Sequence, residues 1–310
     1  MTHKVFIDGE AGTTGLQIRE RLEKRCDIEL IRLPDAVRKD AAARKIALNS
    51  ADAVILCLPD DAAREAMTLI ENSDVRIIDA STAHRVDEAW TYGFPEMTGE
   101  QRDLIRRSKR ISNPGCHATG FIALVRPLVE TGIIPPFFPV TATSLSGYSG
   151  GGKAMIAEFE GGEGRERVYA TGLRHKHLPE MTIWSGLESP PVFSPTVGRF
   201  AQGLVVEVPL QLWALPGEPD MERVHEALCA AYDGERFIRV ADLADSGALT
   251  SVDAASLAGS DQLLIHVFGD PDSQQANLVA VFDNLGKGAS GAAVQNLNLV
   301  LGVDEGLGLN

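Results

Sequence analysis

The chain has few cysteines, few aromatic residues, a shortage of cations and no long apolar run. Its 310 residues include 4 cysteines, 6% aromatic residues, and 29 Lys and Arg against 43 Asp and Glu, for a net charge of −14. No apolar stretch approaches the roughly 20 residues that span a bilayer, which excludes a membrane-spanning helix. The negative charge argues against general nucleic-acid binding. An anionic ligand therefore needs a local group of cations or backbone N–H groups.

The rest of the composition is that of a globular protein, with 44% hydrophobic and 23% charged residues. A chain of this length can build two domains with substantial cores. Because Thr2-His3-Lys4 leads directly into an apolar strand, we expect no signal peptide and a cytoplasmic protein.

The cysteines are spaced for neither a zinc site nor a disulfide framework, and none belongs to a CxxC pair, so we expect no metal. Cys57 lies in an apolar run and Cys229 in a helix-like stretch, which is typical of core thiols. Cys116 differs, because Pro114-Gly115 forms a turn before it and a helix is expected directly after it, over Thr119–Glu130. Helix N-termini stabilise thiolates, so this pattern predicts that Cys116 is a nucleophile.

The first part of the chain alternates apolar strands with helix-like stretches. Strands are expected at Val5–Ile7, Ile28–Leu33, Ala53–Leu58 and Arg76–Asp79, and helices at Leu16–Arg25, Ala41–Leu48 and Asp61–Glu71. This rhythm predicts an α/β domain with a Rossmann-like, doubly wound parallel sheet.

After Cys116 the pattern changes to strands with few helices between them. Strands are expected at Val140–Leu145, Leu204–Leu212, Leu263–Phe268 and Leu278–Phe282, and helices at Met221–Tyr232 and Ala289–Leu301. The pattern favours a second, α+β domain with a mixed or antiparallel sheet. We expect residues 1–115, completed by a C-terminal helix over 289–310, to form the first domain, and residues 116–288 to form the second.

A glycine-rich turn over Gly9–Gly15 follows the first strand and opens a helix, as a dinucleotide site requires. Its GxxGxxG spacing lets the backbone approach a pyrophosphate at the helix N-terminus. The alternative is a tight turn without a ligand. Arg32, near the end of the second strand, is suited to a 2′-phosphate, whereas Asp35 lies late and after a proline. The sequence therefore favours NADP over NAD.

Two further polar segments stand out. Gly172–Glu180 contains His175 and His177, which can serve as acid and base near neutral pH, alternating with Arg174 and Lys176. In an extended segment the cations would share one face and the histidines the other. Ser144–Lys153 combines small residues, glycines and a final lysine, and can cradle an anion. The alternatives are a solvated basic loop for the first segment and a flexible loop between domains for the second.

These motifs together resemble the short form of the N-acetyl-γ-glutamyl-phosphate reductases of arginine biosynthesis, in the semialdehyde dehydrogenase superfamily. The resemblance spans nearly the whole chain and is carried by Gly9–Gly15, Asp79–Thr82, Asn113–Cys116, Ser146–Lys153, His175–Glu180 and Asn284–Gly291. The chain departs from the longer members at Lys176, where they carry arginine, and the two cations are not interchangeable at a bidentate site.

The resemblance implies a covalent reduction. The Cys116 thiolate would attack the acyl phosphate and displace phosphate, which would give a thioester. Hydride from NADPH would then reduce the thioester to an aldehyde. His177 or His175 would take and return the proton; His177 is favoured, but the sequence does not separate them.

The resemblance implies that residues 1–115 with 289–310 form the NADP-binding domain and that residues 116–288 form the catalytic and oligomerisation domain. It also implies the binding residues and a homo-oligomer, either a dimer or a tetramer. For the cofactor these are Gly9, Gly12, Thr13, Thr14, Gly15, Arg32, Ser81, Asn284, Lys287 and Gly288. For a small anionic substrate they are Asn113, Ser146, Ser149, Gly150, Lys153, Arg174 and Glu180.

Three other functions fit parts of the pattern. An aspartate-semialdehyde dehydrogenase shares fold, cofactor and cysteine chemistry, although His175–Glu180 weighs against it. A Cys/His acyl-transfer enzyme without a redox step would use Cys116 but not the glycine turn. A nucleotide sensor would have no need of an activated cysteine.

Overall fold

The computed structural model describes residues 2–310 of the chain. These residues form two compact units. Unit 1 comprises the chain up to Pro95, with Gly99–Gly115 and Ala289–Asn310, and unit 2 comprises Glu96–Thr98 with Cys116–Gly288. Among residues 2–310, no helix has the length and apolar composition needed to cross a membrane.

Unit 1 is built on a six-stranded sheet in the order β2-β1-β3-β4-β6-β5. Every neighbouring pair is parallel. The strands are β1 (His3–Asp8), β2 (Ile28–Ile31), β3 (Ala53–Leu56), β4 (Arg76–Asp79), β5 (Thr91–Tyr92) and β6 (Arg110–Ser112). The order reverses direction at β1, which is the switch point of a doubly wound sheet, so the predicted fold class is confirmed for this unit.

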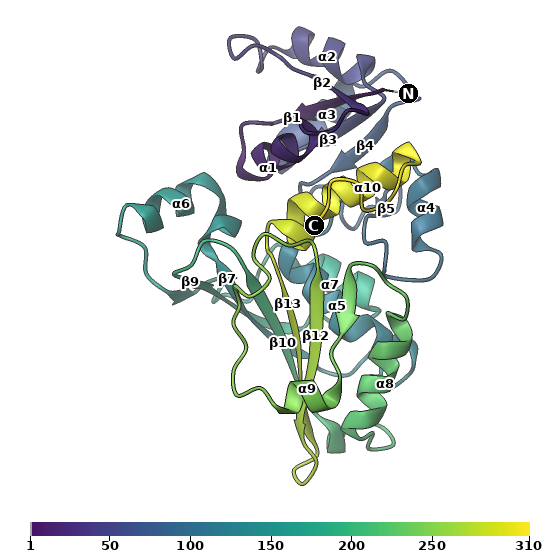
Figure 1. Ribbon diagram of the computed structural model, residues 1–310, viewed down its shortest axis with the longest axis vertical. Coiled ribbons are helices and arrows are strands. Elements are labelled where there is room, and N and C mark those ends of the chain that lie inside the picture. Colours follow the sequence, from purple (N-terminus) through teal and green to yellow (C-terminus); the bar gives the residue numbers. More distant parts are fainter. Residues whose placement is uncertain (1) are drawn as a thin grey trace. The chain divides into compact units, whose positions relative to one another are not determined.

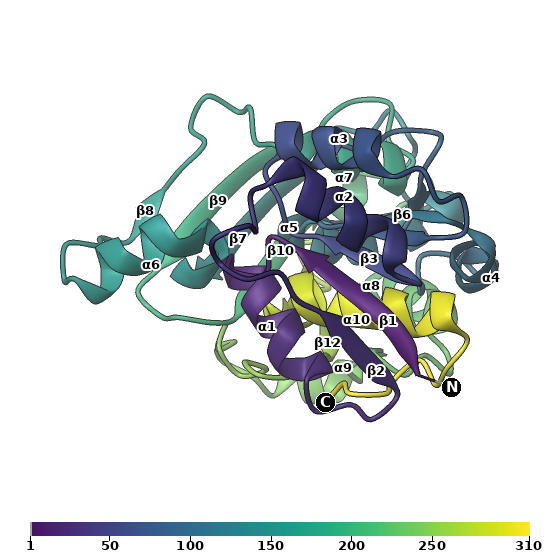
Figure 2. The same cartoon turned by 90° about the horizontal axis from the view of Figure 1, so that it is seen from above.

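Helices cover both faces of this sheet, as Figure 2 shows. The helices of unit 1 are α1 (Thr13–Leu22), α2 (Ala41–Ser50), α3 (Asp60–Leu69), α4 (Gln101–Arg107) and α10 (Gly291–Leu301). Side chains of α2 and α3 share one core cluster with β1, β3 and β4. Side chains of α1, α4 and α10 share the other cluster with the same strands. The nearly continuous apolar sequence of β3, buried along its whole length, follows from this double cover.

Unit 2 is built on a seven-stranded mixed sheet in the order β11-β12-β13-β10-β7-β9-β8. Its strands are β7 (Thr141–Gly147), β8 (Arg167–Val168), β9 (Val192–Gly198), β10 (Leu204–Gln211), β11 (Ile238–Val240), β12 (Leu263–Asp270) and β13 (Gln275–Phe282). The pairs β7–β9 and β11–β12 are parallel and the other four pairs are antiparallel. The expected mixed sheet is therefore present.

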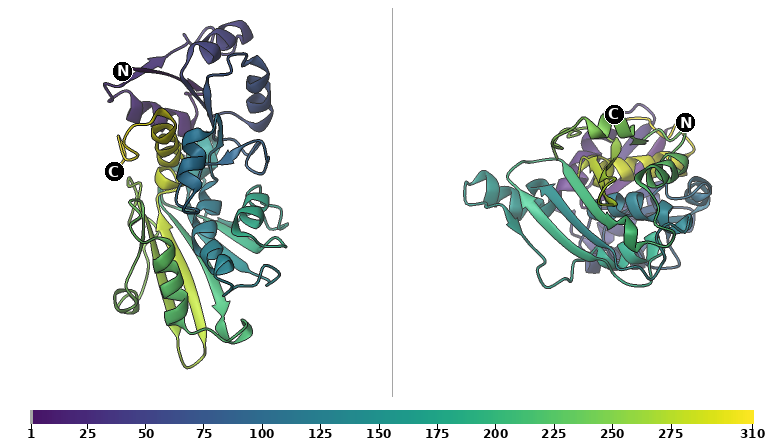
Figure 3. Two further views of the ribbon diagram at one scale, coloured as in Figure 1. Left: turned by 90° about the vertical axis from the view of Figure 1, so that its right-hand side faces the viewer. Right: turned by 90° about the horizontal axis from the view of Figure 1, so that it is seen from below.

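Helices α5 (Cys116–Glu130) and α8 (Met221–Ala231) pack beside the long strands of this sheet (Figures 1 and 3). Helix α5 is buried on all sides from His117 to Val125, because no charged residue interrupts its apolar sequence there. A Cβ at Gly120 would lie 2.8 Å from side-chain atoms of Phe282 and Val206, so glycine permits the close approach of α5 to the sheet. The remaining helices of unit 2 are α6 (Gly152–Glu160), α7 (Leu178–Ser185) and α9 (Leu243–Gly247), with short 3₁₀ turns at Tyr148–Gly151 and Leu212–Ala214.

Some local expectations were wrong. The segment before Glu180 is not extended: it is a turn that ends at His177, the N-cap residue of α7. The glycine-rich segment over 144–153 is not a loop throughout, since it contains the end of β7, a 3₁₀ turn and the start of α6. Helix α5 begins at Cys116 itself, three residues earlier than expected, so the thiol lies on the first residue of the helix.

The C-terminal helix α10 supplies a testable part of the unit 1 core. Leu297 is fully buried among side chains of β1, β3 and β4. We expect Leu297→Ala to lower the free energy of unfolding by about 2–5 kcal/mol, because it leaves a cavity. Urea unfolding monitored by circular dichroism measures this. Leu104→Ala, at a 44% exposed position of α4, is the control and should change stability by less than about 0.5 kcal/mol. Equal midpoints for the two variants would show that α10 is not part of this core.

Candidate active site

Cys116 is the first residue of the 15-residue helix α5 and is half-buried. The thiol thus lies at the positive end of the helix dipole, which favours the thiolate. The other thiols lack this position: Cys26 is exposed, and burial raises the pKa of Cys57 to about 12.

A π-helical turn over Gly286–Ser290 lies against the cysteine. A Cβ at Gly288 would lie 2.9 Å from the Cβ of Cys116, so only glycine allows this contact. The neighbouring Lys287 is 2% exposed, and its ammonium lies 2.7 and 2.8 Å from the carboxylate oxygens of Glu96. It also lies over the ring of Phe237, 5.6 Å from the centroid. Glu96 is a residue that the sequence pattern did not reveal, since its partner is 191 positions away.

Three histidine rings gather in unit 2. The rings of His175 and His177 meet edge to face at 4.6 Å, and the backbone N–H of His177 donates to Nδ1 of His175. Nε2 of His177 lies 3.9 Å from Oε1 of Glu180, and both side chains are buried. The third ring is His117, 5.3 Å from His175 and 5.5 Å from His177. The structure therefore brings together His175, His177 and Glu180, as a shared site requires.

His117 also belongs to this cluster, although the sequence motifs did not single it out. Its Nε2 lies 2.8 Å from the hydroxyl of Tyr169, and its Nδ1 lies 3.1 Å from the hydroxyl of Ser144. Burial, with the nearby charges of His175 and Lys176, lowers the pKa of His117 to about 3. Its position directly after Cys116 was the signal that could have identified it. Arg174 and Lys176, in contrast, are exposed beside the cluster.

The polar segment after β7 gathers around Asn284. The amide of Asn284 donates to the hydroxyl of Ser149 at 3.0 Å and accepts from the N–H of Gly203 at 2.9 Å. A Cβ at Gly150 would lie 3.2 Å from the same amide, and Ser146 donates to the carbonyl of Gly147. Asn284 therefore lies with the serines expected to bind substrate. Lys153, at the start of α6, is exposed.

The glycine turn of unit 1 has the geometry of an anion cradle. A Cβ at Gly9 would lie 2.3 Å from the carbonyl oxygen of Cys57, and one at Gly15 would lie 2.6 Å from that of Gly9. Gly12 differs, because its Cβ would make only ordinary contacts, the nearest at 3.4 Å. It is the N-cap of α1 and offers no side-chain cap to the N–H groups of the first turn, which includes Thr13, Thr14 and Gly15. These residues fit a bound diphosphate.

A pocket of about 420 Å³ adjoins this turn within unit 1. Its lining includes Gly9, Glu10, Leu33, Arg38, Lys39 and Arg44. Arg44 is paired with Asp8, with its Nη2 2.9 Å from the carboxylate, whereas Nε of Arg38 lies 3.7 Å from the exposed Asp35. Arg32 does not line this pocket; its side chain is 55% exposed and lies 3.8 Å from Glu10 and 3.6 Å from Glu23. Arg38 and Lys39 are cations that the sequence analysis did not select.

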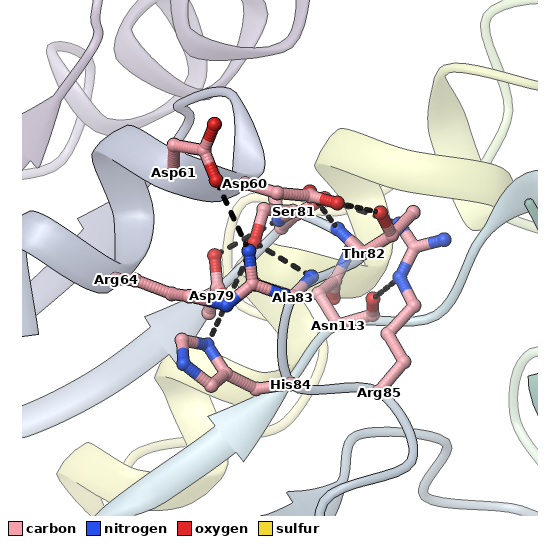
Figure 4. Close-up of polar contacts among 11 residues, drawn as sticks. Asp60, Asp61, Arg64, Asp79, Ser81, Thr82, Ala83, His84, Arg85 and Asn113 are labelled. Carbon is pink, nitrogen blue, oxygen red and sulfur yellow. Dashed lines mark hydrogen bonds and ion pairs between the residues drawn. The ribbon is translucent and has the colours of Figure 1, made fainter.

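A hydrogen-bonded network follows β4 in the same unit (Figure 4). The fully buried carboxylate of Asp79 accepts from the N–H and hydroxyl of Ser81, at 2.9 and 2.7 Å, and lies 2.6 Å from Nδ1 of His84. Nε of Arg85 donates to the carbonyl of Asn113 at 2.9 Å. The side chain of Asn113 accepts from Asn296 and donates to the carbonyl of Ala289. The network fixes the loop that carries Ser81 and the chain that leads into the Pro114-Gly115 turn.

Two family models match parts of the chain. The family model described as "Semialdehyde dehydrogenase, NAD binding domain" matches residues 34–105. The one described as "Semialdehyde dehydrogenase, dimerisation domain" matches residues 116–284.

Solved structures with the same fold include aspartate semialdehyde dehydrogenase II from Vibrio cholerae, complexed with ASA. It has a TM-score of 0.71 and 18% identity, and the match covers 97% of this chain and 98% of that one. The enzyme from Candida albicans, solved with NADP, has a TM-score of 0.64 and 15% identity, covering 97% and 99%. Identities this low show the shared fold alone.

Curated relatives are much more similar in sequence. N-acetyl-gamma-glutamyl-phosphate reductase 2 of Nostoc sp. is 50% identical over 318 residues, which covers 99% of both chains. N-acetyl-gamma-glutamyl-phosphate reductase of Rhizobium etli is 52% identical over 308 residues, covering 97% of this chain and 99% of the relative. With half of its residues identical over nearly its whole length, the chain belongs to the N-acetyl-γ-glutamyl-phosphate reductase family.

Proposed function

We propose that this protein reduces N-acetyl-γ-glutamyl phosphate to N-acetylglutamate semialdehyde with NADPH, in arginine biosynthesis. The observation that carries the proposal is a cysteine on the first residue of a buried helix, in a unit that also gathers three histidines. Its membership of the reductase family supplies the substrate and the reaction.

Cys116 starts the reaction as a thiolate. Its sulfur attacks the γ-carbonyl carbon of the acyl phosphate, and the C–O bond to phosphate breaks. Inorganic phosphate departs, and the acyl group remains on Cys116 as a thioester. When bound, NADPH would supply the hydride that reduces the carbonyl carbon of this thioester. The oxygen of the reduced carbon gains a proton, which gives a hemithioacetal. When the hemithioacetal collapses, that oxygen loses its proton, the C–S bond breaks, the aldehyde departs, and Cys116 is again a thiolate.

His177 or His175 takes and returns the proton in these steps. His117 is poorly suited to this role, because both of its ring nitrogens have hydroxyl partners and burial lowers its pKa to about 3, which makes it a weak base. Glu180, buried near Nε2 of His177, is placed to orient that ring, which favours His177 as the acid and base.

The substrate is an anion bound by an acidic protein, so the positive groups must be local. Arg174 and Lys176 are exposed cations next to the histidines in the sequence. Lys153 is an exposed cation on the glycine-rich segment. The set proposed to hold substrate remains that of the sequence analysis: Asn113, Ser146, Ser149, Gly150, Lys153, Arg174 and Glu180.

In this proposal unit 1 binds the diphosphate of the dinucleotide. The turn from Gly9 to Gly15 holds the diphosphate through backbone N–H groups, and Gly12 leaves room for its approach. Ser81, Asn284, Lys287 and Gly288 keep their proposed roles in forming the cofactor site. For Lys287 that role is indirect, since its ammonium is paired with Glu96.

Arg38 and Lys39 extend the proposed cofactor site beyond Arg32. They line the pocket beside the glycine turn, and a 2′-phosphate needs cations there. The proposal also includes a homo-oligomer, dimer or tetramer, in the cytoplasm. The family model described as a dimerisation domain supports the oligomer.

The reaction is tested most directly in reverse. Purified protein with NADP⁺ and phosphate should form NADPH, followed by its absorbance, with N-acetylglutamate semialdehyde and not with aspartate semialdehyde. Cys116→Ser should lower the rate roughly 10³-fold or more and leave NADPH binding intact, because serine is a far weaker nucleophile. Cys229→Ser, at a thiol of α8 outside the site, is the matched control.

The other functions predict different results. Turnover of the aspartyl aldehyde alone would keep the mechanism and change the substrate. A protein that binds no nicotinamide nucleotide but forms a Cys116 thioester would be an acyl-transfer enzyme. Full activity of Cys116→Ser would reject the covalent mechanism.

Cofactor preference tests the cations beside the glycine turn. We expect Arg38→Ala to weaken NADPH binding roughly tenfold to hundredfold, with little effect on NADH, because a charge-assisted hydrogen bond to the 2′-phosphate is lost. Titration calorimetry with both nucleotides measures the ratio. The same ratio measured for Lys39→Ala and Arg32→Ala tests the neighbouring cations. Arg106→Ala, on α4, is the control. If Arg32→Ala alone changes the ratio, the 2′-phosphate binds at Arg32.

A further inference from the structure

Asn284 lies two residues beyond the end of β13, and both ends of its side-chain amide are engaged within unit 2. The residue is 1% exposed. Its Oδ1 accepts from the backbone N–H of Gly203 at 2.9 Å, and its Nδ2 donates to the hydroxyl oxygen of Ser149 at 3.0 Å. Because a backbone N–H can only donate, the contact with Gly203 fixes which end of the amide carries the oxygen. The amide cannot turn over without setting two donors against each other.

Backbone hydrogen bonds hold the two chain segments that this amide joins. The carbonyl of Gly203 accepts from the N–H of Gly147 at 2.9 Å, and the carbonyl of Ala201 accepts from the N–H of Ser149 at 3.1 Å. Gly203 has a φ of +121°, a conformation that favours glycine. The hydroxyl of Ser149 is therefore held in a fixed place beside the amide of Asn284.

The contact with Asn284 decides what the hydroxyl of Ser149 can bind. Its oxygen accepts from the amide, so its proton is not used in that bond. Among residues 2–310, no group accepts that proton, although the side chain is only 6% exposed. Ser146 is the opposite case, because its hydroxyl donates to the carbonyl of Gly147 and only lone pairs remain for a ligand. The O–H of Ser149 is thus a buried donor that a ligand has to satisfy.

The surroundings of Ser149 favour an anionic oxygen as the acceptor. Ser149 lies in the 3₁₀ turn Tyr148–Gly151, directly before α6, and no side chain caps the start of that helix. The exposed cation Lys153 is the second residue of α6. Both the helix dipole and this cation stabilise negative charge. The substrate and the dinucleotide of the proposed reaction both carry such oxygens.

We propose that Asn284 is a positioning residue that keeps the oxygen of Ser149 as an acceptor and thereby directs its O–H to an anionic oxygen of a bound reactant. The inference rests on the proposed function, which places Ser149 with the substrate and Asn284 in the cofactor site. It joins the two residues into one unit, in which Asn284 acts on the reactant through Ser149. The anionic oxygen belongs to the substrate or to the dinucleotide, which share this chemistry.

The reverse reaction tests this when NADP⁺, phosphate and N-acetylglutamate semialdehyde are varied in turn. We expect Ser149→Ala to raise the KM of one of these reactants roughly ten- to hundredfold with kcat nearly unchanged, because a hydrogen bond to a charged oxygen is lost. Asn284→Ala should raise the same KM roughly three- to tenfold, since the hydroxyl remains but is no longer directed. Ser149→Thr, which keeps the hydroxyl, should restore most of the wild-type KM.

The double variant Ser149→Ala/Asn284→Ala measures whether the two residues act as one unit. Once the hydroxyl is gone, removal of the amide has nothing to act through. The double variant should therefore have the KM of Ser149→Ala within about twofold. Effects that multiply would show independent action and overturn the inference, as would an unchanged KM for every reactant in Ser149→Ala.

Titration calorimetry with NADPH locates the anionic oxygen without turnover. If the raised KM is that of NADP⁺, Ser149→Ala should weaken NADPH binding by a similar factor, which assigns the oxygen to the dinucleotide. If the raised KM is that of phosphate or the aldehyde, NADPH binding to Ser149→Ala should be unchanged, which assigns the oxygen to the substrate.

Asn49, on α2 of unit 1, is the matched control, because both ends of its amide are engaged as well. Its Nδ2 donates to the carbonyl of Leu69 at 2.8 Å, and its Oδ1 accepts from the N–H of Glu71 at 2.7 Å. Asn49→Ala should be less stable than the unaltered protein yet keep every KM. The same rise in KM in Asn49→Ala would mean that Asn284→Ala acts through stability, and would overturn the inference.

Failure of the proposed function has a different signature. If the unaltered protein forms no NADPH with the acetylated aldehyde, the reductase function is wrong, and the same set of variants is then compared by the dissociation constants of NADPH and inorganic phosphate. If the unaltered protein turns over and the effects of Ser149→Ala and Asn284→Ala multiply, only the positioning role is wrong.

Discussion

The first turn of α5 is the constraint on which the rest of unit 2 depends. A thiolate gains from a helix N-terminus only if the helix cannot move away from it. Helix α5 meets this condition because it is buried on all sides for nine residues after Cys116, from His117 to Val125. Behind the cysteine, Gly288 leaves no room for a side chain, and the Lys287–Glu96 pair anchors its turn. Separating such a pair costs on the order of 3–5 kcal/mol, so the turn is held firmly.

Charge is distributed in the site so that similar residue types can act differently. His117 and His177 are both buried, and both ring nitrogens of His117 lie within hydrogen-bond distance of hydroxyl groups. Burial lowers the pKa of His117 to about 3, whereas His177 lies near the carboxylate of Glu180. The two rings therefore have different electrostatic environments, as residues with different roles in one site would.

In a chain of net charge −14, an anion must be bound by local positive groups. Unit 1 offers backbone N–H groups at the start of α1 and places Arg38 and Lys39 in the wall of the adjoining pocket. Two of the three glycines in its turn are required by the chain's own packing. A side chain at Gly12, in contrast, would make only ordinary contacts within the chain. Glycine at this position is explained by the close approach of a ligand.

The sequence by itself determined the two sheets, the glycine turn and the place of Cys116, because strand alternation, turn residues and helix starts are local patterns. It also determined the family, because the motifs that carry the resemblance are continuous. It did not determine the partners of Asn284, the pairing of Glu96 with Lys287, or the contact of His117 with Tyr169. These depend on contacts between residues tens to nearly two hundred positions apart, which local periodicity does not record. Only the tertiary structure decided them, since burial and pairing are set by which strands and helices become neighbours.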